Sequence, residues 1–139
     1  MVLKLDSLKV DLNKERSGDW VDFPDWPGVM FHVKSVEAPD FRTARDHLLR
    51  KLSRKHKGKP IPPDDLQQEI GVLYSKHILL DWKGLDVPYS SDAASDILTD
   101  PAYRKVFAAV EWCANQVGDS DAEFIEDAAK NSEKRSATS

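Results

Sequence analysis

Residues 20–36 have the sequence Trp-Val-Asp-Phe-Pro-Asp-Trp-Pro-Gly-Val-Met-Phe-His-Val-Lys-Ser-Val, and this stretch decides how the first part of the chain folds. Residues 20–23 and 29–36 are rich in aromatic and β-branched side chains, which favour strands. The prolines and the glycine in residues 24–28 specify a turn between them. We therefore predict a β-hairpin. Residues 3–10, upstream of it, alternate apolar with charged side chains, a pattern that predicts a half-buried strand in part of that stretch.

Downstream of the hairpin, the spacing of apolar residues and the capping residues predict helices. Pro39 and Asp100-Pro101 are residues that favour helix starts, and Ser120-Asp-Ala-Glu123 is a capping-box sequence. Gly84 is suited to end a helix. The predicted helices span residues 39–57, 64–84, 90–98, 100–117 and 120–128. The expected fold class is α+β and mainly α, with a short N-terminal β-hairpin element followed by about five helices packed as a small bundle.

The chain has 139 residues, a length typical of one domain, with 40% apolar and 32% charged residues. We expect a single domain over residues 1–130, β-rich in 1–37 and helical in 38–130, followed by a disordered polar tail at 131–139. No apolar run approaches the length of a membrane-spanning helix, and we expect no signal peptide. Cys113 is the single cysteine, so no intrachain disulfide can form, and these features together favour a reducing cytoplasm.

The net charge of −4 conceals two segments of opposite sign. Residues 42–59 carry eight Lys or Arg residues and one acid, whereas residues 81–127 carry eleven acids and three Lys or Arg residues. Such an arrangement can attract charged partners, or pair copies of the chain with one another as a homo-oligomer. Two solvated faces of opposite sign that bind nothing explain the pattern equally well.

Sequence patterns that would support catalysis or metal binding are incomplete. His77 and Asp81 are four residues apart, as two zinc ligands on one helix can be, but no third ligand lies close in sequence. Cys113 continues an apolar stripe with Val106 and Val110, which predicts a buried thiol rather than a nucleophile. The sequence has no glycine-rich phosphate loop, no Gly-x-Ser-x-Gly elbow and no paired-cysteine metal motif. We therefore expect a protein that is not an enzyme and needs no metal or cofactor.

Three tryptophans are candidates for contacting a protein partner. They are Trp20, Trp26 and Trp82. Tryptophan is an effective anchor in protein interfaces and an equally common core residue. Trp26, in the predicted turn, is the one most expected to be exposed.

The basic residues Arg50, Arg54 and Lys55 form a second candidate surface. Cations of this kind can contact the phosphates of nucleic acids. However, residues 42–59 contain no Phe, Tyr or Trp on which bases could stack, and basic residues at a helix C-terminus also complement the helix dipole. Binding to protein is therefore favoured over binding to nucleic acid.

Several short segments, in this order along the chain, resemble the tail assembly chaperones of long-tailed, lambda-like bacteriophages. The segments are residues 3–10, 18–21, 26–29, 31–34, 80–84, 88–90, 98–101 and 130–132. The most telling succession is Trp-Lys-Gly at 82–84, then Pro-Tyr-Ser at 88–90, then the Asp-Pro of 100–101. Lys34 departs from the pattern, in which we expect arginine; the charge is kept, and a bidentate contact is lost.

The resemblance implies a cytoplasmic assembly factor of the bacterial host that is absent from the mature virion. In that family the chaperone binds the long tape measure protein, keeps it soluble and helps to recruit tail tube subunits around it. A groove lined by apolar side chains between neighbouring helices, which receives a partner helix, would suit this role without a reactive centre. The alternative is a structural component of the tail or head–tail joint that is retained in the virion.

Overall fold

The structure, a computed structural model, describes residues 1–126 of the chain. These residues divide into two compact units: unit 1 contains residues 1–11 and 119–126, and unit 2 contains residues 12–118. Unit 2 holds a three-stranded sheet and the α-helices, and unit 1 holds a two-stranded sheet. The fold is α+β and mainly α, as the sequence predicts.

The sheet of unit 2 is built around the predicted hairpin. Strands β2 (Asp19–Asp22) and β3 (Met30–Val33) pair antiparallel, and β4 (Leu79–Lys83) pairs antiparallel with the other edge of β3. The strand order is β2-β3-β4, which places β3 in the centre. Phe31 and Val33 of this central strand are 0% exposed, because helices cover the face on which they lie.

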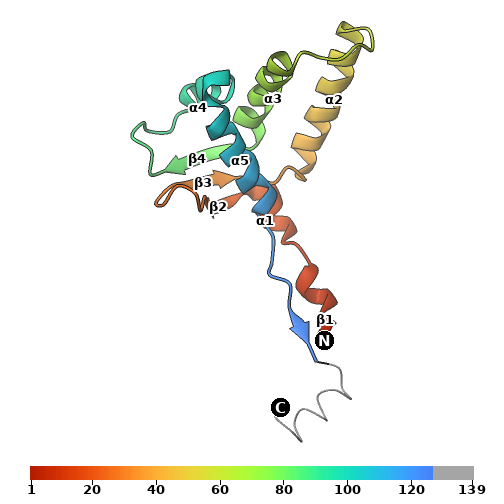
Figure 1. The fold of residues 1–139 in the computed structure, drawn as a ribbon, viewed down its shortest axis with the longest axis vertical. Coiled ribbons are helices and arrows are strands. Elements are labelled where there is room, and N and C mark those ends of the chain that lie inside the picture. Colours follow the sequence, from red (N-terminus) through yellow and green to blue (C-terminus); the bar gives the residue numbers. More distant parts are fainter. Residues whose placement is uncertain (127–139) are drawn as a thin grey trace, which may run out of the picture. The chain divides into compact units, whose positions relative to one another are not determined.

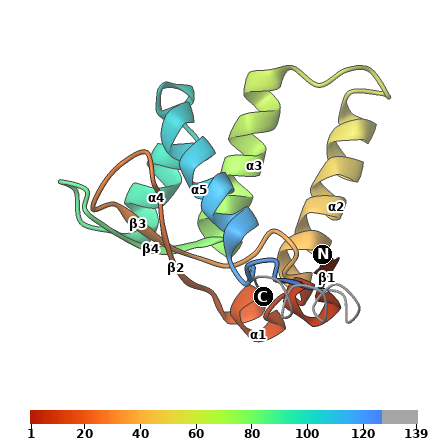
Figure 2. The ribbon, with the colours of Figure 1, turned by 60° about the horizontal axis from the view of Figure 1, so that its bottom comes forward.

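The α-helices described all lie in unit 2. They are α1 (Leu12–Ser17), α2 (Pro39–Lys55), α3 (Pro63–His77), α4 (Ser91–Leu98) and α5 (Arg104–Gln116). Proline, whose φ suits a first helical turn, begins both α2 and α3. The Ser90 side chain accepts a hydrogen bond from the backbone of Ala93 and so caps α4. Figures 1 and 2 show α3 between α2 and α4, and α5 contacts the sheet at β2 and β3.

The core of unit 2 joins the sheet to these helices. Its largest fully buried side chains are Phe31, Phe41, Ile78, Leu79, Leu98, Val33, Val110 and Cys113. Helices α3 and α4 approach so closely that a Cβ on Gly71 would lie 2.1 Å from the carbonyl oxygen of Leu98. Only glycine fits at this contact, so residue 71 fixes how near α4 can come to α3.

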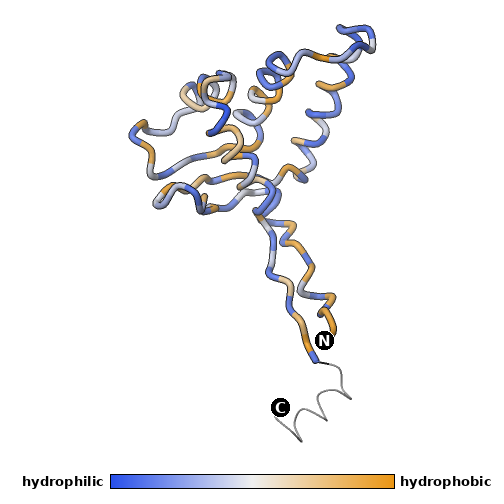
Figure 3. Tube along the Cα trace, in the orientation of Figure 1, coloured by the Kyte–Doolittle hydropathy of each residue, from blue (hydrophilic) through white to orange (hydrophobic). Residues whose placement is uncertain are grey.

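Unit 1 is formed by segments from both ends of the described chain. Strand β1 (Val2–Leu3) pairs antiparallel with β5 (Phe124–Ile125), and a short 3₁₀ helix, η1 (Leu5–Leu8), follows β1. The Ser120 hydroxyl oxygen lies 2.6 and 2.8 Å from the backbone carbonyl oxygens of Ser7 and Lys9, which share its single donor proton. None of the described residues of unit 1 is buried, and Figure 3 shows hydrophobic residues along both strands.

The structure corrects the predicted end of the second helix. That helix does not continue to Gly84: α3 ends at His77, and residues 79–83 form strand β4. The apolar residues Ile78 and Leu79 fit a helical stripe, but they are buried beside the central strand β3 instead. The predictions for residues 20–23, 29–36, 39–57 and 90–98 are confirmed in element type, with ends shifted by a few residues.

One prediction for the segments of unit 1 is wrong in element type, and the other is right in type only at Leu3. The capping-box sequence at residues 120–123 starts no helix, because the Ser120 hydroxyl bonds to residues 7 and 9 and residues 124–125 pair as β5. Only residues 2–3 of the N-terminal stretch form a strand, and they are exposed rather than half-buried. The expected single domain over 1–130 stays a prediction, and the expected tail at 131–139 lies outside the described residues.

Candidate functional site

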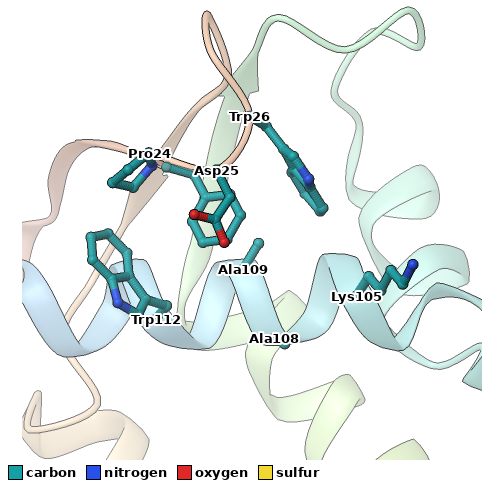
Figure 4. A pocket seen from close by; sticks show the side chains of 8 residues that line it. Pro24, Asp25, Trp26, Lys105, Ala108, Ala109 and Trp112 are labelled. Carbon is teal, nitrogen blue, oxygen red and sulfur yellow. The ribbon is translucent and has the colours of Figure 1, made fainter.

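A groove lies between the β2–β3 connection and helix α5, with a volume of about 450 Å³ (Figure 4). Four lining residues come from the hairpin and four from the helix: Phe23, Pro24, Asp25 and Trp26, and Lys105, Ala108, Ala109 and Trp112. Trp112 is 40% exposed, so it offers a large apolar surface to the groove and to solvent. Such a surface is a candidate binding site for another molecule.

The hairpin residues are held in place by the turn that the sequence predicts. The backbone N–H of Trp26 donates to Phe23 and that of Val29 donates to Trp26, at 3.1 and 3.0 Å. The ring of Phe23 packs edge-on against both tryptophans, 4.8 Å from Trp26 and 5.7 Å from Trp112 between ring centroids. These contacts join the connection to α5 and give the groove a preformed aromatic wall.

Small residues of α5 and one charged residue on each side also shape the groove. Ala108 and Ala109 have methyl side chains, which leave room between the larger residues on either side. Asp25 and Lys105 place one negative and one positive group among the lining residues, as Figure 4 shows. An apolar floor with two opposite charges suits the apolar stripe of an amphipathic helix and its polar flanks.

The three predicted tryptophans lie in three different environments. Trp82 is 6% exposed, and its indole N–H donates to the carbonyl of Val87 at 2.7 Å, so it belongs to the core and offers no anchor. Trp20 is half-buried on β2, stacked on His32 and under the Lys83 ammonium. Trp26 is half-buried too, and it is the one of the three that lines the groove.

Sequence reasoning did not single out Trp112. The apolar stripe of α5 runs through Val106, Val110 and Cys113, and residue 112 is displaced by about 100° around the helix from its neighbour at 113. A large aromatic residue outside the buried stripe was the signal that could have identified it. The predicted basic residues Arg50, Arg54 and Lys55 are exposed on α2 and do not line the groove.

Lys34, Asp40 and His77 form a polar cluster that links the segment just after β3 to α2 and α3. The Lys34 ammonium donates to the Asp40 carboxylate at 2.6 Å, and His77 Nδ1 lies 3.6 Å from the same oxygen. The hydrogen bond from Lys34 holds the pKa of the Asp40 carboxyl below its ordinary value of 3.8. Lysine at position 34, the departure from the chaperone pattern, thus makes one ammonium contact rather than a bidentate one.

The groups considered for catalysis and metal binding have other surroundings. His77 lies beside Asp40, while the carboxylate of Asp81 accepts from the backbone N–H of Trp82 at 2.8 Å. Among residues 1–126, no group of three or more His, Cys, Asp or Glu side chains is placed to hold a metal ion. Burial raises the pKa of the Cys113 thiol to about 12, and the Asp22 carboxylate adds to the rise. The thiol is therefore protonated near neutral pH.

Comparison with known protein families identifies what the chain is related to. The family model described as YdaY prophage protein matches residues 36–131, more than two-thirds of the chain. The chain belongs to the YdaY prophage protein family. The family match spans α2 to α5, including the Trp112 side of the groove, and leaves the β2–β3 hairpin outside it. No curated protein and no solved structure matches the chain.

None of the helices in residues 1–126 combines the length and the apolar character needed to span a membrane.

Proposed function

We propose that this prophage protein is a tail assembly chaperone, which binds the tape measure protein, keeps it soluble and helps to recruit tail tube subunits. Membership of a prophage family and the ordered resemblance of short segments to tail assembly chaperones both support the proposal. The chaperone acts in the cytoplasm of the bacterial host, is not an enzyme, uses no cofactor and does not remain in the mature virion.

The groove between the hairpin and α5 is the observation that carries this proposal. Trp112 is 40% exposed although it is large and apolar, and the ring of Phe23 packs edge-on against it. A long helical tape measure protein exposes an apolar stripe that would aggregate without cover. Seating that stripe against Trp26 and Trp112 removes apolar surface of both partners from water.

The charges of Asp25 and Lys105 favour one orientation of a helix bound in the groove. Because the two charges come from opposite walls, a partner helix with a base on one flank of its apolar stripe and an acid on the other can pair with both. Exposed pairs of this kind contribute little affinity, so their effect is to select orientation and partner. The aromatic contacts supply most of the binding free energy.

The test is co-expression of the chain with the tape measure protein of the same prophage, followed by measurement of the soluble tape measure protein that is retained with it. Trp112→Ala should weaken the complex by roughly thirtyfold, the effect of losing a central interface tryptophan. Tyr103→Ala is the matched control, because Tyr103 is an aromatic residue 47% exposed that does not line the groove. It should leave the complex unchanged.

Two results would overturn the proposal. If the wild-type chain leaves the solubility of the tape measure protein unchanged, the chaperone function is wrong. If the chain is a stoichiometric component of purified phage particles, the alternative of a structural tail or head–tail joining protein replaces it. Equal losses for Trp112→Ala and Tyr103→Ala would keep the chaperone function and remove the groove as its site.

A further inference from the structure

The end of α2 and the loop after it carry a dense group of cations, which we call the basic tip. Its members are exposed side chains with no acid among them: Arg50, Lys51, Arg54, Lys55, Lys57 and Lys59. Arg54 and Lys55 lie in the last turn of α2, where a favourable interaction with the helix dipole explains why basic residues occur. Within residues 1–126 no ion pair joins any of the six to a carboxylate. The two acids that open α3, Asp64 and Asp65, offset only part of this charge.

Helix α4 and its flanks carry the opposite charge, in a group that we call the acidic ridge. It consists of exposed residues in a stretch, 84–103, that contains no Lys or Arg: Asp86, Asp92, Asp96 and Asp100. Asp92 lies in the first turn of α4, and Asp100 caps η2 (Pro101–Tyr103), so each has a local structural role. Asp96 has no such role. No ion pair to a cation of residues 1–126 involves the acidic ridge.

The basic tip and the acidic ridge lie on opposite sides of unit 2. Helix α3 packs against α2 on one side and against α4 on the other, and Figures 1 and 2 show α2 and α4 at the two edges of the row. The two groups therefore cannot neutralise each other within one chain. Each also borders a large exposed apolar side chain: Leu49, 40% exposed, precedes Arg50, and Val87, 46% exposed, follows Asp86.

We propose that the basic tip of one copy docks on the acidic ridge of a second copy. Charge complementarity identifies the occupant, and the spacing agrees with it. Arg50 and Arg54 are one helical turn apart, as are Asp92 and Asp96, so each pair presents two charges about 6 Å apart. With equal spacing, each arginine of one copy can face one aspartate of the other. Leu49 and Val87 add apolar surface at the edges of the contact.

Because the basic tip and the acidic ridge lie on opposite sides of unit 2, a second copy docked on one of them cannot also reach the other, so the contact does not end with a dimer. A head-to-tail contact leaves one basic tip and one acidic ridge free at the two ends of any pair, and further copies add until the row closes or stops. The product is a ring or an open row of copies. The contact does not depend on the tail assembly role, because neither charged group lines the aromatic groove.

Sedimentation velocity of the full chain tests the proposal at about 20 mM and about 0.5 M salt, which differ strongly in charge screening. Wild-type protein should self-associate at low salt and dissociate at high salt. A tip variant, Arg50→Glu with Arg54→Glu, and a ridge variant, Asp92→Lys with Asp96→Lys, should each associate at least about tenfold more weakly. Arg16→Glu with Lys76→Glu is the matched control for the tip variant, with the same change in charge at exposed sites elsewhere.

Mixing the tip variant with the ridge variant gives the decisive measurement, because the ridge variant keeps an intact basic tip that can dock on the intact acidic ridge of the tip variant. The altered tip and the altered ridge are also of opposite charge to each other. The mixture should associate at low salt although each variant alone does not. A wild-type chain that stays monomeric at low salt, or a mixture that does not associate, would overturn the proposal. So would a basic tip that binds a duplex DNA oligonucleotide in place of a second copy. Circular dichroism checks that each variant folds. If the tip variant does not fold, it is replaced by Arg50→Gln with Arg54→Gln. If the ridge variant does not fold, it is replaced by Asp92→Asn with Asp96→Asn.

Discussion

The two units differ in where their large apolar side chains lie: unit 2 buries many of them, whereas unit 1 leaves them exposed. In unit 2, Phe31, Val33 and Leu98 are 0% exposed, and the helices and the sheet close over them. In unit 1, Leu5 is 78% exposed and Phe124 is 55% exposed, and the strands pair without a core beneath them. Because burial of apolar surface is the main source of folding free energy, nearly all of the stability that residues 1–126 contribute resides in unit 2. Substitutions of equal size should therefore have very unequal effects in the two units.

The largest effect is expected at the contact between α3 and α4. Gly71→Ala would place a Cβ 2.1 Å from the carbonyl oxygen of Leu98, and a backbone atom cannot move aside as a side chain can. We expect a loss of about 3 kcal/mol or more in the free energy of unfolding, measured by urea denaturation. Gly58→Ala is the control: nothing lies within 4 Å of its Cβ position, and only the positive φ of 75° opposes it. A Gly71→Ala loss no greater than that of Gly58→Ala would contradict the close approach of the two helices.

The removal of the buried tryptophan should have an effect of similar size. Trp82→Ala leaves a cavity beside Tyr89 and removes the donor to Val87, so we expect a loss of about 3–5 kcal/mol in the free energy of unfolding. Trp112→Ala removes the same side chain from a surface position and should cost less than half as much. Thermal denaturation followed by circular dichroism compares the two. Equal losses would show that Trp112 is structural and would weaken its assignment to a binding groove.

A smaller, pH-dependent effect is expected at the polar cluster of unit 2. Because the pKa of Asp40 lies below its ordinary value of 3.8 in the folded chain, its contribution to stability is complete well above pH 3.8 and is lost as the pH falls through the folded-state pKa. Asp40→Asn removes this contribution, so the stability of the variant should fall less steeply than that of wild type in that acid range. Parallel curves for the two proteins would show that the hydrogen bond from Lys34 stabilises nothing.

The smallest effect is expected in unit 1. Leu5→Ser replaces a side chain that is 78% exposed, so almost no apolar surface returns to water on unfolding. We expect a change within about 0.5 kcal/mol in the free energy of unfolding, measured beside Leu98→Ala, which removes a fully buried leucine. A large loss for Leu5→Ser would mean that unit 1 contributes to the stability of the fold after all.

Local signals in the sequence predict the parts of unit 2 that local chemistry determines. The prolines and glycine of residues 24–28 specify the hairpin turn, and the Ser90 hydroxyl caps α4 by accepting a backbone hydrogen bond. Strand β4 could not be predicted this way, because its pairing with β3 joins residues some fifty positions apart in the chain. The apolar residues of 78–80 suit a strand and a helix equally, and tertiary contact decides between them.

The sequence predicted the hairpin side of the candidate groove but not its helix side, because contacts between residues distant in the chain bring the two sides together. Trp26 follows from the turn in which it lies, whereas its neighbour Trp112 approaches only because Phe23 packs between the hairpin and α5. Trp82 could not be separated from the other tryptophans, because its burial depends on the unpredicted strand β4. The basic residues of α2, by contrast, are exposed where the charge pattern of the sequence places them.

The pairing of β1 with β5 has a mechanical consequence. Val2 pairs with Ile125, Leu3 pairs with Phe124, and the backbone of Lys4 donates to Glu123, so residues 1 and 126 lie at the same end of this ladder. Tension applied between residues 1 and 126 would open these hydrogen bonds one after another, as a zipper opens, instead of shearing them together. Unit 1 would therefore yield at low force and lengthen the molecule while the strands of unit 2 still bear no load.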